Sequence, residues 1–403
     1  MKSLSQDERK LLIIQGLDIL AYSLASIFVT VFFFANSDLK TTVLYRAISF
    51  ASMAFFMGAA GWTLRKFSSG LHMKVALFSG AFYYFLLFLL RQESVHYIIP
   101  LAILDGFTGG WYWAGFNLNQ YILSHSGRRV EYFGWALALV NLAQAVGPAV
   151  GGLIIAFAGA SALGVMGGYG TLFLLVSIII AGITLLIGKL PTHELPAFRY
   201  RHLLEHKRSR EWKLVLGQQG VNGLYDVASN TVIGVLLYTI IHEEAKLGVT
   251  LAVASVIGMI SSLGAIRLLT RFGWSYWIGA VGLGLSLILF ALFQNWSGVV
   301  LFLILSALTV PLLQTRMSTT FYEALDHAPG TWQDKYHFLL ERDVVLAVLR
   351  MVSYIDLYGI LLFGNEITLA RSWLLILPIV PLFIAFLLHK SSVLASQGLA
   401  LRS

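Results

Sequence analysis

The sequence has no cysteine and few charged residues for its length. None of its 403 residues is Cys, which excludes disulfide bonds, cysteine-ligated zinc and thiol catalysis. Only 12% are Asp, Glu, Lys or Arg, whereas a soluble domain has about 25%. Hydrophobic residues make up 58% of the chain, more than a water-soluble fold of this size can bury. Lipid is therefore the expected solvent for most of the chain, and nothing predicts a cofactor or a metal site.

Apolar runs of about 20 residues, the length that crosses a bilayer as a helix, recur along the chain. Twelve are predicted to be transmembrane helices: residues 11–34, 41–64, 73–90, 96–123, 132–157, 166–188, 214–241, 248–269, 275–293, 298–324, 343–364 and 372–389. Runs such as FLLVSIII do not alternate apolar and polar residues, as the strands of a membrane β-barrel would. The first run lacks a signal-peptide cleavage site and is predicted to be a span. We therefore predict an all-α integral membrane protein.

The distribution of Lys and Arg predicts the orientation. Of the 28, Arg46, Arg316 and Arg350 lie deep within spans, and 21 lie in loops, tails or the ends of spans on one side. The other side has only Lys40, Arg91, Lys246 and Arg371. Because cytoplasmic loops of membrane proteins are enriched in basic residues, both termini are predicted to be cytoplasmic. The formal net charge of +8 is then explained without a nucleic-acid partner.

The chain is predicted to consist of two six-helix halves, residues 1–188 and 214–403. The basic segment 189–213 between them is interpreted as a cytoplasmic linker rather than as a nucleic-acid-binding arm. A short repeat supports this division: QGLDILAYSLAS begins at Gln15, and QGVNGLYDVASN begins 204 residues later, at Gln219. Repeated halves of this kind are how many secondary transporters are built.

Ionisable residues within the predicted spans are candidates for function, because each costs about 2.5–3.5 kcal/mol to insert near the bilayer centre. They are Asp18, Arg46, Asp105, Asp226, Arg316, Glu323, Arg350 and Asp356. Some of them can be structural pairs or can reach the interface, and Arg46 with Asp105 is predicted to be a buried structural pair. Asp226, Asp18 and Asp105 are the predicted proton-coupling residues, in that order. Asp226 comes first because it lies nearest the middle of its span.

Two helical faces are predicted to bind substrate. Gln219, Asn222 and Asp226 share one face of the seventh span. In the fourth span, DGFTGGWYWAGFNLNQY places Trp113, Asn117 and Gln120 on one polar and aromatic face with Asp105. This face is interpreted as the wall of a hydrated cavity rather than as an interfacial anchor. Arg316 and Arg350 are further candidates, since a guanidinium binds an anionic group well.

Twelve spans in two related halves, a basic central loop and cytoplasmic termini resemble the major facilitator superfamily over essentially the whole chain. In the fifth span, GWALALVNLAQAVGPAVGG is similar to the antiporter motif of that family, with Gly147, Pro148, Gly151 and Gly152 at matching positions. The resemblance implies that these four residues shape the contact between the halves. It also implies that the first, fourth, seventh and tenth spans line a central cavity. The loop after the second span departs from the family pattern, because Arg65 stands where an acidic residue is usual.

These features together predict a secondary active transporter in a bacterial plasma membrane. The predicted activity is proton-coupled efflux of a small amphipathic or aromatic compound by a monomer, with protons, substrate and the lipid bilayer as its partners. Proton-coupled uptake of a polar or anionic nutrient and a lipid or glycolipid flippase remain alternatives, as does a non-transporting sensor or assembly factor. Enzymatic activity is not predicted, because IHEEAK at 241–246 lacks the second histidine of a metalloprotease motif and no nucleotide-binding glycine loop is present.

Overall fold

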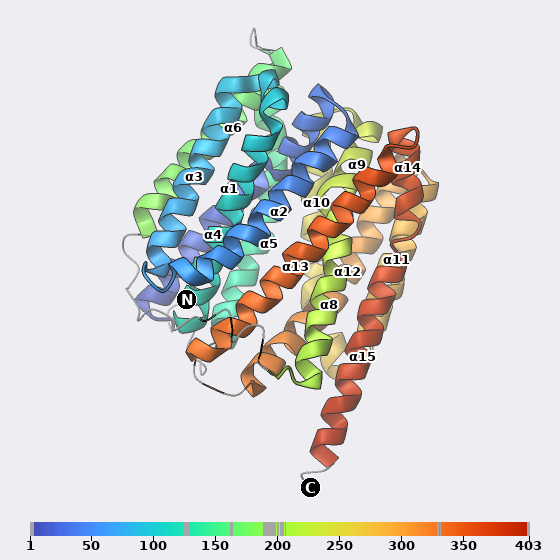
Figure 1. Ribbon diagram of the computed structural model, residues 1–403. Helices are drawn as coiled ribbons and strands as arrows, with labels where there is room; N and C mark the ends of the chain where they lie inside the picture. Colours follow the sequence, from blue (N-terminus) through green and yellow to red (C-terminus); the bar gives the residue numbers. More distant parts are fainter. Residues whose placement is uncertain are drawn as a thin grey trace.

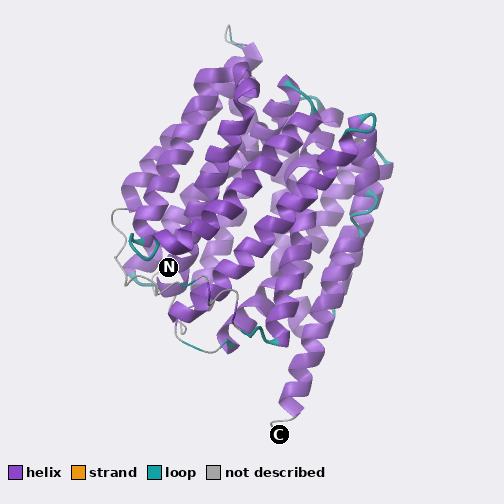
Figure 2. Ribbon diagram, viewed as in Figure 1, coloured by secondary structure: helices purple, strands orange, loops and turns teal. Residues whose placement is uncertain are grey.

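The computed structural model describes residues 4–123, 129–161, 164–187, 199, 201, 205, 207–328, 330 and 332–400. Over these ranges the chain consists of helices joined by short loops and contains no β-strand, as predicted (Figure 2). The helices of the N-terminal half are α1 (Gln6–Asn36), α2 (Leu39–Thr63), α3 (Ser69–Leu90), the 3₁₀ segment η1 (Arg91–Tyr97), α4 (Ile98–Leu123), α5 (Arg129–Gly159) and α6 (Gly164–Ile187). Those of the C-terminal half are α8 (Arg210–Val227), the π-helical segment η3 (Ala228–Val232), α9 (Ile233–Ile241), α10 (Glu244–Arg271), α11 (Tyr276–Leu292), α12 (Trp296–His327), α13 (Trp332–Leu361), α14 (Glu366–Leu374) and α15 (Ile379–Ala400).

Ten segments of the described chain are long and apolar enough to cross a membrane. The longest, Ser69–Leu123, contains both α3 and α4, which turn at η1 and pack against each other. The helix α11 has only 17 residues and is shorter than the other spans. The predicted span 372–389 is not one continuous helix, because the helix is interrupted between Leu374 and Ile379. Most of the predicted linker 189–213 lies outside the described residues.

Polar residues at the helix starts explain where several spans begin. The Ser5 side chain accepts a hydrogen bond from the Glu8 amide, while the Glu8 carboxylate accepts one from the Ser5 amide. The Asp38 side chain accepts a 2.7 Å hydrogen bond from the Thr41 amide at the start of α2. Such caps satisfy backbone donors that have no partner within the helix, so the short polar loops specify the helix boundaries.

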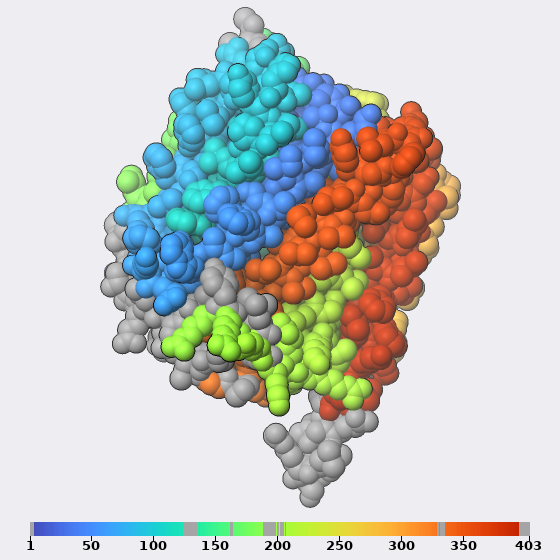
Figure 3. Space-filling model, viewed as in Figure 1, coloured from blue at the N-terminus to red at the C-terminus, as the bar shows by residue number. Residues whose placement is uncertain are grey.

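Two pairs of helices join the halves along their length. The helix α2 packs against α13, and α5 packs against α10. Figure 3 shows α2 and α13 side by side across one face of the molecule, as in the ribbon view of Figure 1. The start of α1 and the end of α15 lie at the same end of the bundle (Figure 1). The functional residues described below lie along these contacts.

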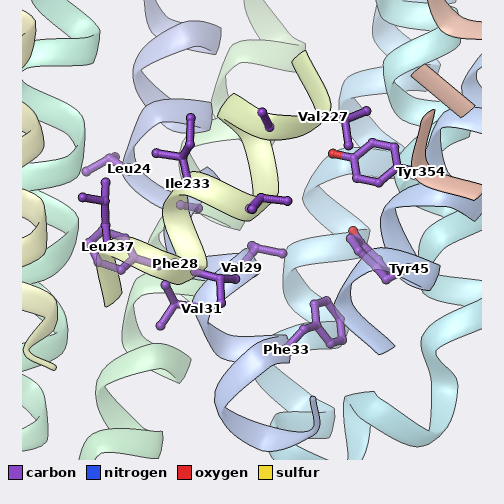
Figure 4. Close-up of a cluster of buried hydrophobic side chains, with 14 of the residues drawn as sticks. Leu24, Phe28, Val29, Val31, Phe33, Tyr45, Val227, Ile233, Leu237 and Tyr354 are labelled. Atoms are coloured by element: carbon purple, nitrogen blue, oxygen red, sulfur yellow. The ribbon is translucent and has the colours of Figure 1, made fainter. Parts of the chain in front are cut away.

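The hydrophobic core continues from one half into the other. Leu24 and Phe28 of α1 lie with Ile233 and Leu237 of α9 in a cluster of buried side chains (Figure 4). The outer surface is apolar as well, with exposed large side chains such as Phe55. An apolar core within an apolar surface is what a helical membrane protein requires, because lipid takes the place of water around it.

Candidate functional site

The site is built around Asp226, which lies where the regular winding of the seventh predicted span changes. The helix α8 ends one residue after Asp226, and the π-helical segment η3 follows at once. The side chains of Ser229 and Asn230 donate hydrogen bonds of 3.2 and 2.7 Å to the Asp226 carbonyl oxygen. They thereby satisfy a backbone acceptor in the region where the hydrogen-bonding pattern changes. Single-turn π-helical segments occur frequently at functional sites.

The Asp226 carboxylate forms an ion pair with Arg350 of α13. The Arg350 Nε atom donates a 2.8 Å hydrogen bond to Asp226 Oδ2, and Nη2 donates to the same oxygen. The other oxygen, Oδ1, accepts from Asn222 at 3.3 Å. The Asn222 side chain accepts in turn from Gln314 of α12 at 3.1 Å. A polar chain therefore runs from α12 through α8 to α13.

The Arg350 guanidinium also reaches the N-terminal half. Its central carbon lies 5.2 Å from the centre of the Phe50 ring of α2, within the range of a cation–π interaction. The Phe50 ring is stacked on Tyr354 of α13, with ring centres 5.5 Å apart. The Tyr354 hydroxyl forms a 2.7 Å hydrogen bond with Thr231 in η3. The contact between the halves is therefore linked to the ion pair and to the π-helical segment.

A second, looser pair of opposite charges lies in the N-terminal half. Arg46 Nη1 of α2 is 3.8 Å from Asp105 Oδ2 of α4, so the two predicted partners are brought together. This distance is too long for a hydrogen bond. Arg46 Nη2 instead donates to Thr30 at 2.9 Å, and Asp105 accepts from Ser49 at 2.6 Å. Arg46 Nε is buried and has no hydrogen-bond partner among the described residues.

Tyr22 of α1 interacts electrostatically with both ion pairs. Its phenol is within electrostatic range of Arg46, Asp105 and Arg350, which come from three different helices. The side chain is nevertheless 51% exposed, so these helices leave open space beside it. Asp105 and Arg350 reach such space as well, since their side chains are 28% and 20% exposed. The two ion pairs and Tyr22 form what we call the central cluster: Tyr22, Arg46, Asp105, Asp226 and Arg350.

The other candidates on α1 and α4 are spread along the bundle. Asp18 is half-buried on α1, within electrostatic range of Tyr22 and beside Tyr112 of α4. Asn117 donates a 2.7 Å hydrogen bond to Asp343 of α13 and so joins the halves a few turns away from Asp105. Trp113 and Gln120, like Asn117, lie outside the central cluster. Trp113 is partly exposed, and Gln120 lies beside Tyr132 of α5. The predicted polar face of the fourth span therefore serves two separate contacts.

The candidates of the C-terminal half also lie partly inside and partly outside the central cluster. Gln219 is half-buried on α8, two turns before Asp226. The two candidate guanidiniums do not converge, because Arg316 Nη2 donates to Ser392 of α15 at 3.2 Å and not to the central cluster. The guanidinium that accompanies Arg350 there is Arg46. Among the described residues, no group of three His, Asp or Glu side chains is placed to hold a metal ion.

The glycines of the fifth span lie at close helix contacts. A Cβ placed on Gly147 would lie 2.5 Å from the Ser23 Cβ of α1, and one on Gly151 would overlap the Leu24 carbonyl oxygen. Gly152 faces the C-terminal half, and a Cβ on it would overlap the Glu244 carbonyl oxygen of α10. Gly248 of α10 approaches the Pro148 carbonyl oxygen equally closely. The motif therefore allows α5 to touch α1 and α10 backbone to backbone.

Sequence reasoning missed Tyr22, Phe50 and Tyr354 as site residues. Aromatic residues are common in membrane spans, so their side chains alone carried no signal. The internal repeat did contain a signal for Tyr22. In the first copy of the repeat, Tyr22 occupies the position that Asp226 occupies in the second copy.

Solved structures with the same architecture are membrane transporters. The nucleoside transporter NupG superposes with a TM-score of 0.68 at 14% identity, covering 96% of this chain and 99% of its own. A D-xylose–proton symporter gives 0.67 at 14% identity, covering 94% and 96%, and a bacterial homologue of the iron transporter ferroportin in an outward-facing state gives 0.65 at 14%, covering 96% and 100%. No family model and no curated protein matches the sequence. The chain therefore has the fold of these solved structures, as the resemblance in its sequence predicted.

Proposed function

We propose that the protein is a secondary active transporter that couples the movement of a small molecule to protons by alternating access. In this proposal a monomer crosses a bacterial plasma membrane twelve times, with its two halves joined by residues 189–213 and both termini cytoplasmic. The fold supports secondary transport, and the uneven distribution of Lys and Arg supports the orientation.

The ion pair of Asp226 with Arg350 is the observation on which proton coupling rests. The pair lies deep in the bundle and next to open space, with side chains that are 15% and 20% exposed. A proton on Asp226 removes its negative charge, which weakens a charge-assisted hydrogen bond and releases Arg350. Because Arg350 also contacts Phe50 of the other half, its release changes the contact between the halves. Asp18 and Asp105 are the next candidates for the proton.

Efflux of an amphipathic or aromatic compound is the proposed direction and substrate type. Tyr22 and Phe50 offer aromatic surface beside the ion pairs, and Trp113 offers more along α4. The glycine and proline motif of α5, which resembles an antiporter motif, supports export. Asn117, Gln120, Gln219 and Asn222 are the proposed polar contacts.

Uptake of a polar or anionic nutrient is the second candidate. It is favoured by the presence of two guanidiniums, Arg46 and Arg350, within electrostatic range of Tyr22. One structural neighbour is a sugar–proton symporter and another is a nucleoside transporter, so this fold also serves polar solutes.

The coupling is tested in proteoliposomes with imposed pH gradients and a panel of aromatic, amphipathic and polar compounds. Asp226→Asn keeps the size of the side chain but removes its charge, so downhill exchange should persist while gradient-driven accumulation is lost. Glu323→Gln, at an exposed carboxylate of α12, is the matched control and should accumulate substrate normally. Normal accumulation by Asp226→Asn would exclude Asp226 as the coupling residue, and Asp18→Asn and Asp105→Asn would be tested next.

The orientation is tested separately by labelling single cysteines, because the natural chain has none. A membrane-impermeant thiol reagent should label Ser37→Cys, which lies in the loop before α2, in intact cells. It should label Lys207→Cys, before α8, only after the membrane is opened. The reverse pattern would overturn the orientation.

A further inference from the structure

The two guanidiniums of the central cluster come from opposite halves of the chain, Arg46 from a buried position and Arg350 from a partly exposed one. Arg46 of α2 and Arg350 of α13 both act electrostatically on the half-exposed Tyr22. Both also act on Tyr354, whose ring is stacked on Phe50. Positive charge and aromatic surface are therefore combined at one place, in contact with both halves.

Neither guanidinium is saturated by its carboxylate. A guanidinium has five N–H donors. Arg350 directs two of them, from Nε and Nη2, at a single oxygen of Asp226. Arg46 is only loosely associated with Asp105, at 3.8 Å, and its buried Nε has no partner among the described residues. Donors therefore remain that can bind a further acceptor.

We propose that the substrate is a small aromatic carboxylate, whose carboxylate takes the place of Asp226 on Arg350 while its ring packs beside Tyr22 and Phe50. This inference rests on the proposed transport function and names the substrate class of the same site. The arrangement favours an anion because a guanidinium can bind a carboxylate through two parallel hydrogen bonds. Arg46, within electrostatic range of Tyr22, adds positive potential while it is only loosely paired with Asp105, at 3.8 Å.

The exchange keeps the net charge of the site constant. In the empty site, Arg350 is balanced by Asp226. In the loaded site, the substrate carboxylate balances Arg350 and a proton neutralises Asp226, so one anion and one proton occupy the site together. Joint occupancy corresponds to cotransport, so this exchange belongs to the second candidate, proton-coupled uptake. A charge without a partner inside the bundle would cost several kcal/mol. The groups that face Asp226 include the cation Arg350 from α13, the phenol of Tyr225 on α8 and, through Asn222, the neutral Gln314 of α12.

Binding to the purified full-length protein in detergent tests this without any gradient. Titration calorimetry compares benzoate with benzamide, its uncharged analogue, and benzylamine, its cationic analogue. The wild type should bind benzoate at least about tenfold more tightly than either, which corresponds to about 1.4 kcal/mol. Equal binding of benzoate and benzamide, or no carboxylate-dependent binding of benzoate at all, would overturn the proposal.

Variants of the ion pair give opposite expected results. Asp226→Asn removes the competing carboxylate and should tighten benzoate binding by about tenfold, the effect of one charge-assisted hydrogen bond. Arg350→Gln should abolish the preference for benzoate over benzamide, and Arg267→Gln, at an exposed position of α10, should preserve it. If Arg350→Gln does not fold, the neutral double variant Asp226→Asn/Arg350→Gln takes its place, with the same expectation.

A folded Asp226→Asn protein that binds benzoate more weakly than the wild type would contradict the exchange on Arg350. The transport proposal can fail separately. Normal gradient-driven accumulation by Asp226→Asn, together with retained benzoate selectivity, would overturn coupling through Asp226 and leave the substrate class intact.

Discussion

The two helix contacts that join the halves along their length are built from opposite kinds of residue. Between α5 and α10, Gly152 and Gly248 each face a carbonyl oxygen of the other helix, so the backbones touch. Between α2 and α13, the contact is made by long side chains, with Arg350 over the Phe50 ring and Phe50 stacked on Tyr354. A backbone contact cannot change without moving a helix, whereas side chains can exchange partners. The difference indicates that α5–α10 keeps its spacing while the α2–α13 contact rearranges.

Polar side chains connect the halves on both sides, since Tyr169 of α6 donates a 3.1 Å hydrogen bond to Glu244 of α10, but two further connections lie on the α2–α13 side. Asn117 of α4 bonds Asp343 of α13, and Lys40 of α2 lies 3.1 Å from Glu366 of α14. These two contacts lie on either side of the central cluster along α13 and its neighbours. A substrate that exchanges partners on Arg350 therefore acts on the side of the molecule that is held by side chains.

The largest expected effect on stability is from Arg350→Ala. Removing one member of a buried ion pair leaves the other charge uncompensated, which typically costs about 3–5 kcal/mol. Asp226 is the carboxylate left behind, at 15% exposure. Thermal unfolding of the purified protein measures the loss, with Arg267→Ala on the exposed face of α10 as control. Replacing Asp226 and Arg350 together with leucine should recover part of it. If the Arg350→Ala protein melts like the wild type, the ion pair does not stabilise the contact between α2 and α13.

A smaller effect is expected on the other contact, from Gly152→Ala. The added Cβ would overlap the Glu244 carbonyl oxygen, so α5 and α10 must separate, and overpacking of this kind costs about 1–3 kcal/mol. Gly58→Ala of α2 is the matched control, because a Cβ there meets nothing within 4 Å. Since Ala favours a helix over Gly by up to about 1 kcal/mol, the control should be neutral or stabilising. Equal melting temperatures of the two variants would show that the backbone contact between α5 and α10 does not contribute to stability.

Much of this fold could be predicted from the sequence, because the length of apolar runs is a local property. The second span was predicted at 41–64 and is Leu39–Thr63, and the eighth was predicted at 248–269 and is Glu244–Arg271. The last span, predicted at 372–389, lies within the apolar segment Glu366–Leu394, but its helix is interrupted between Leu374 and Ile379. Pro378 was the available signal, since the residue before a proline is disfavoured in a helix.

Less of the site could be predicted, because pairing depends on how each helix is rotated about its axis. The sequence left Arg316 and Arg350 as equal candidates for binding an anionic group. The rotation of α12 directs Arg316 toward Ser392 of α15, while α13 directs Arg350 toward Asp226. Arg46 and Asp105 were predicted to be a close pair, and they lie near each other but with the looser geometry of 3.8 Å.

That looser geometry predicts a smaller effect for Arg46→Ala than for Arg350→Ala. Asp105 keeps its hydrogen bond from Ser49 and is 28% exposed, so it is not left without a partner. The loss is then mainly the hydrogen bond from Arg46 to Thr30, worth about 1.5 kcal/mol for a charged donor. The same thermal unfolding experiment measures it. A loss as large as that of Arg350→Ala would mean that the two ion pairs are energetically equivalent, contrary to their geometry.

The smallest effect is expected from Lys40→Gln, at the ion pair with Glu366. Lys40 is 36% exposed, and exposed ion pairs contribute only about 0–1 kcal/mol. Glu366 has a second task, because it also accepts a 2.8 Å hydrogen bond from the Leu39 amide at the start of α2. Glu366→Gln should therefore cost more than Lys40→Gln, although both remove the same ion pair. Melting curves of the two single variants and the double variant separate these contributions. If the pair itself holds the halves together, the single variants will be equally destabilised and the double variant no worse than either. If the side chain of Glu366 acts mainly as a cap on α2, Lys40→Gln will melt within error of the wild type. The contact between α2 and α14 will then depend on the hydrogen bond from the Leu39 amide to Glu366.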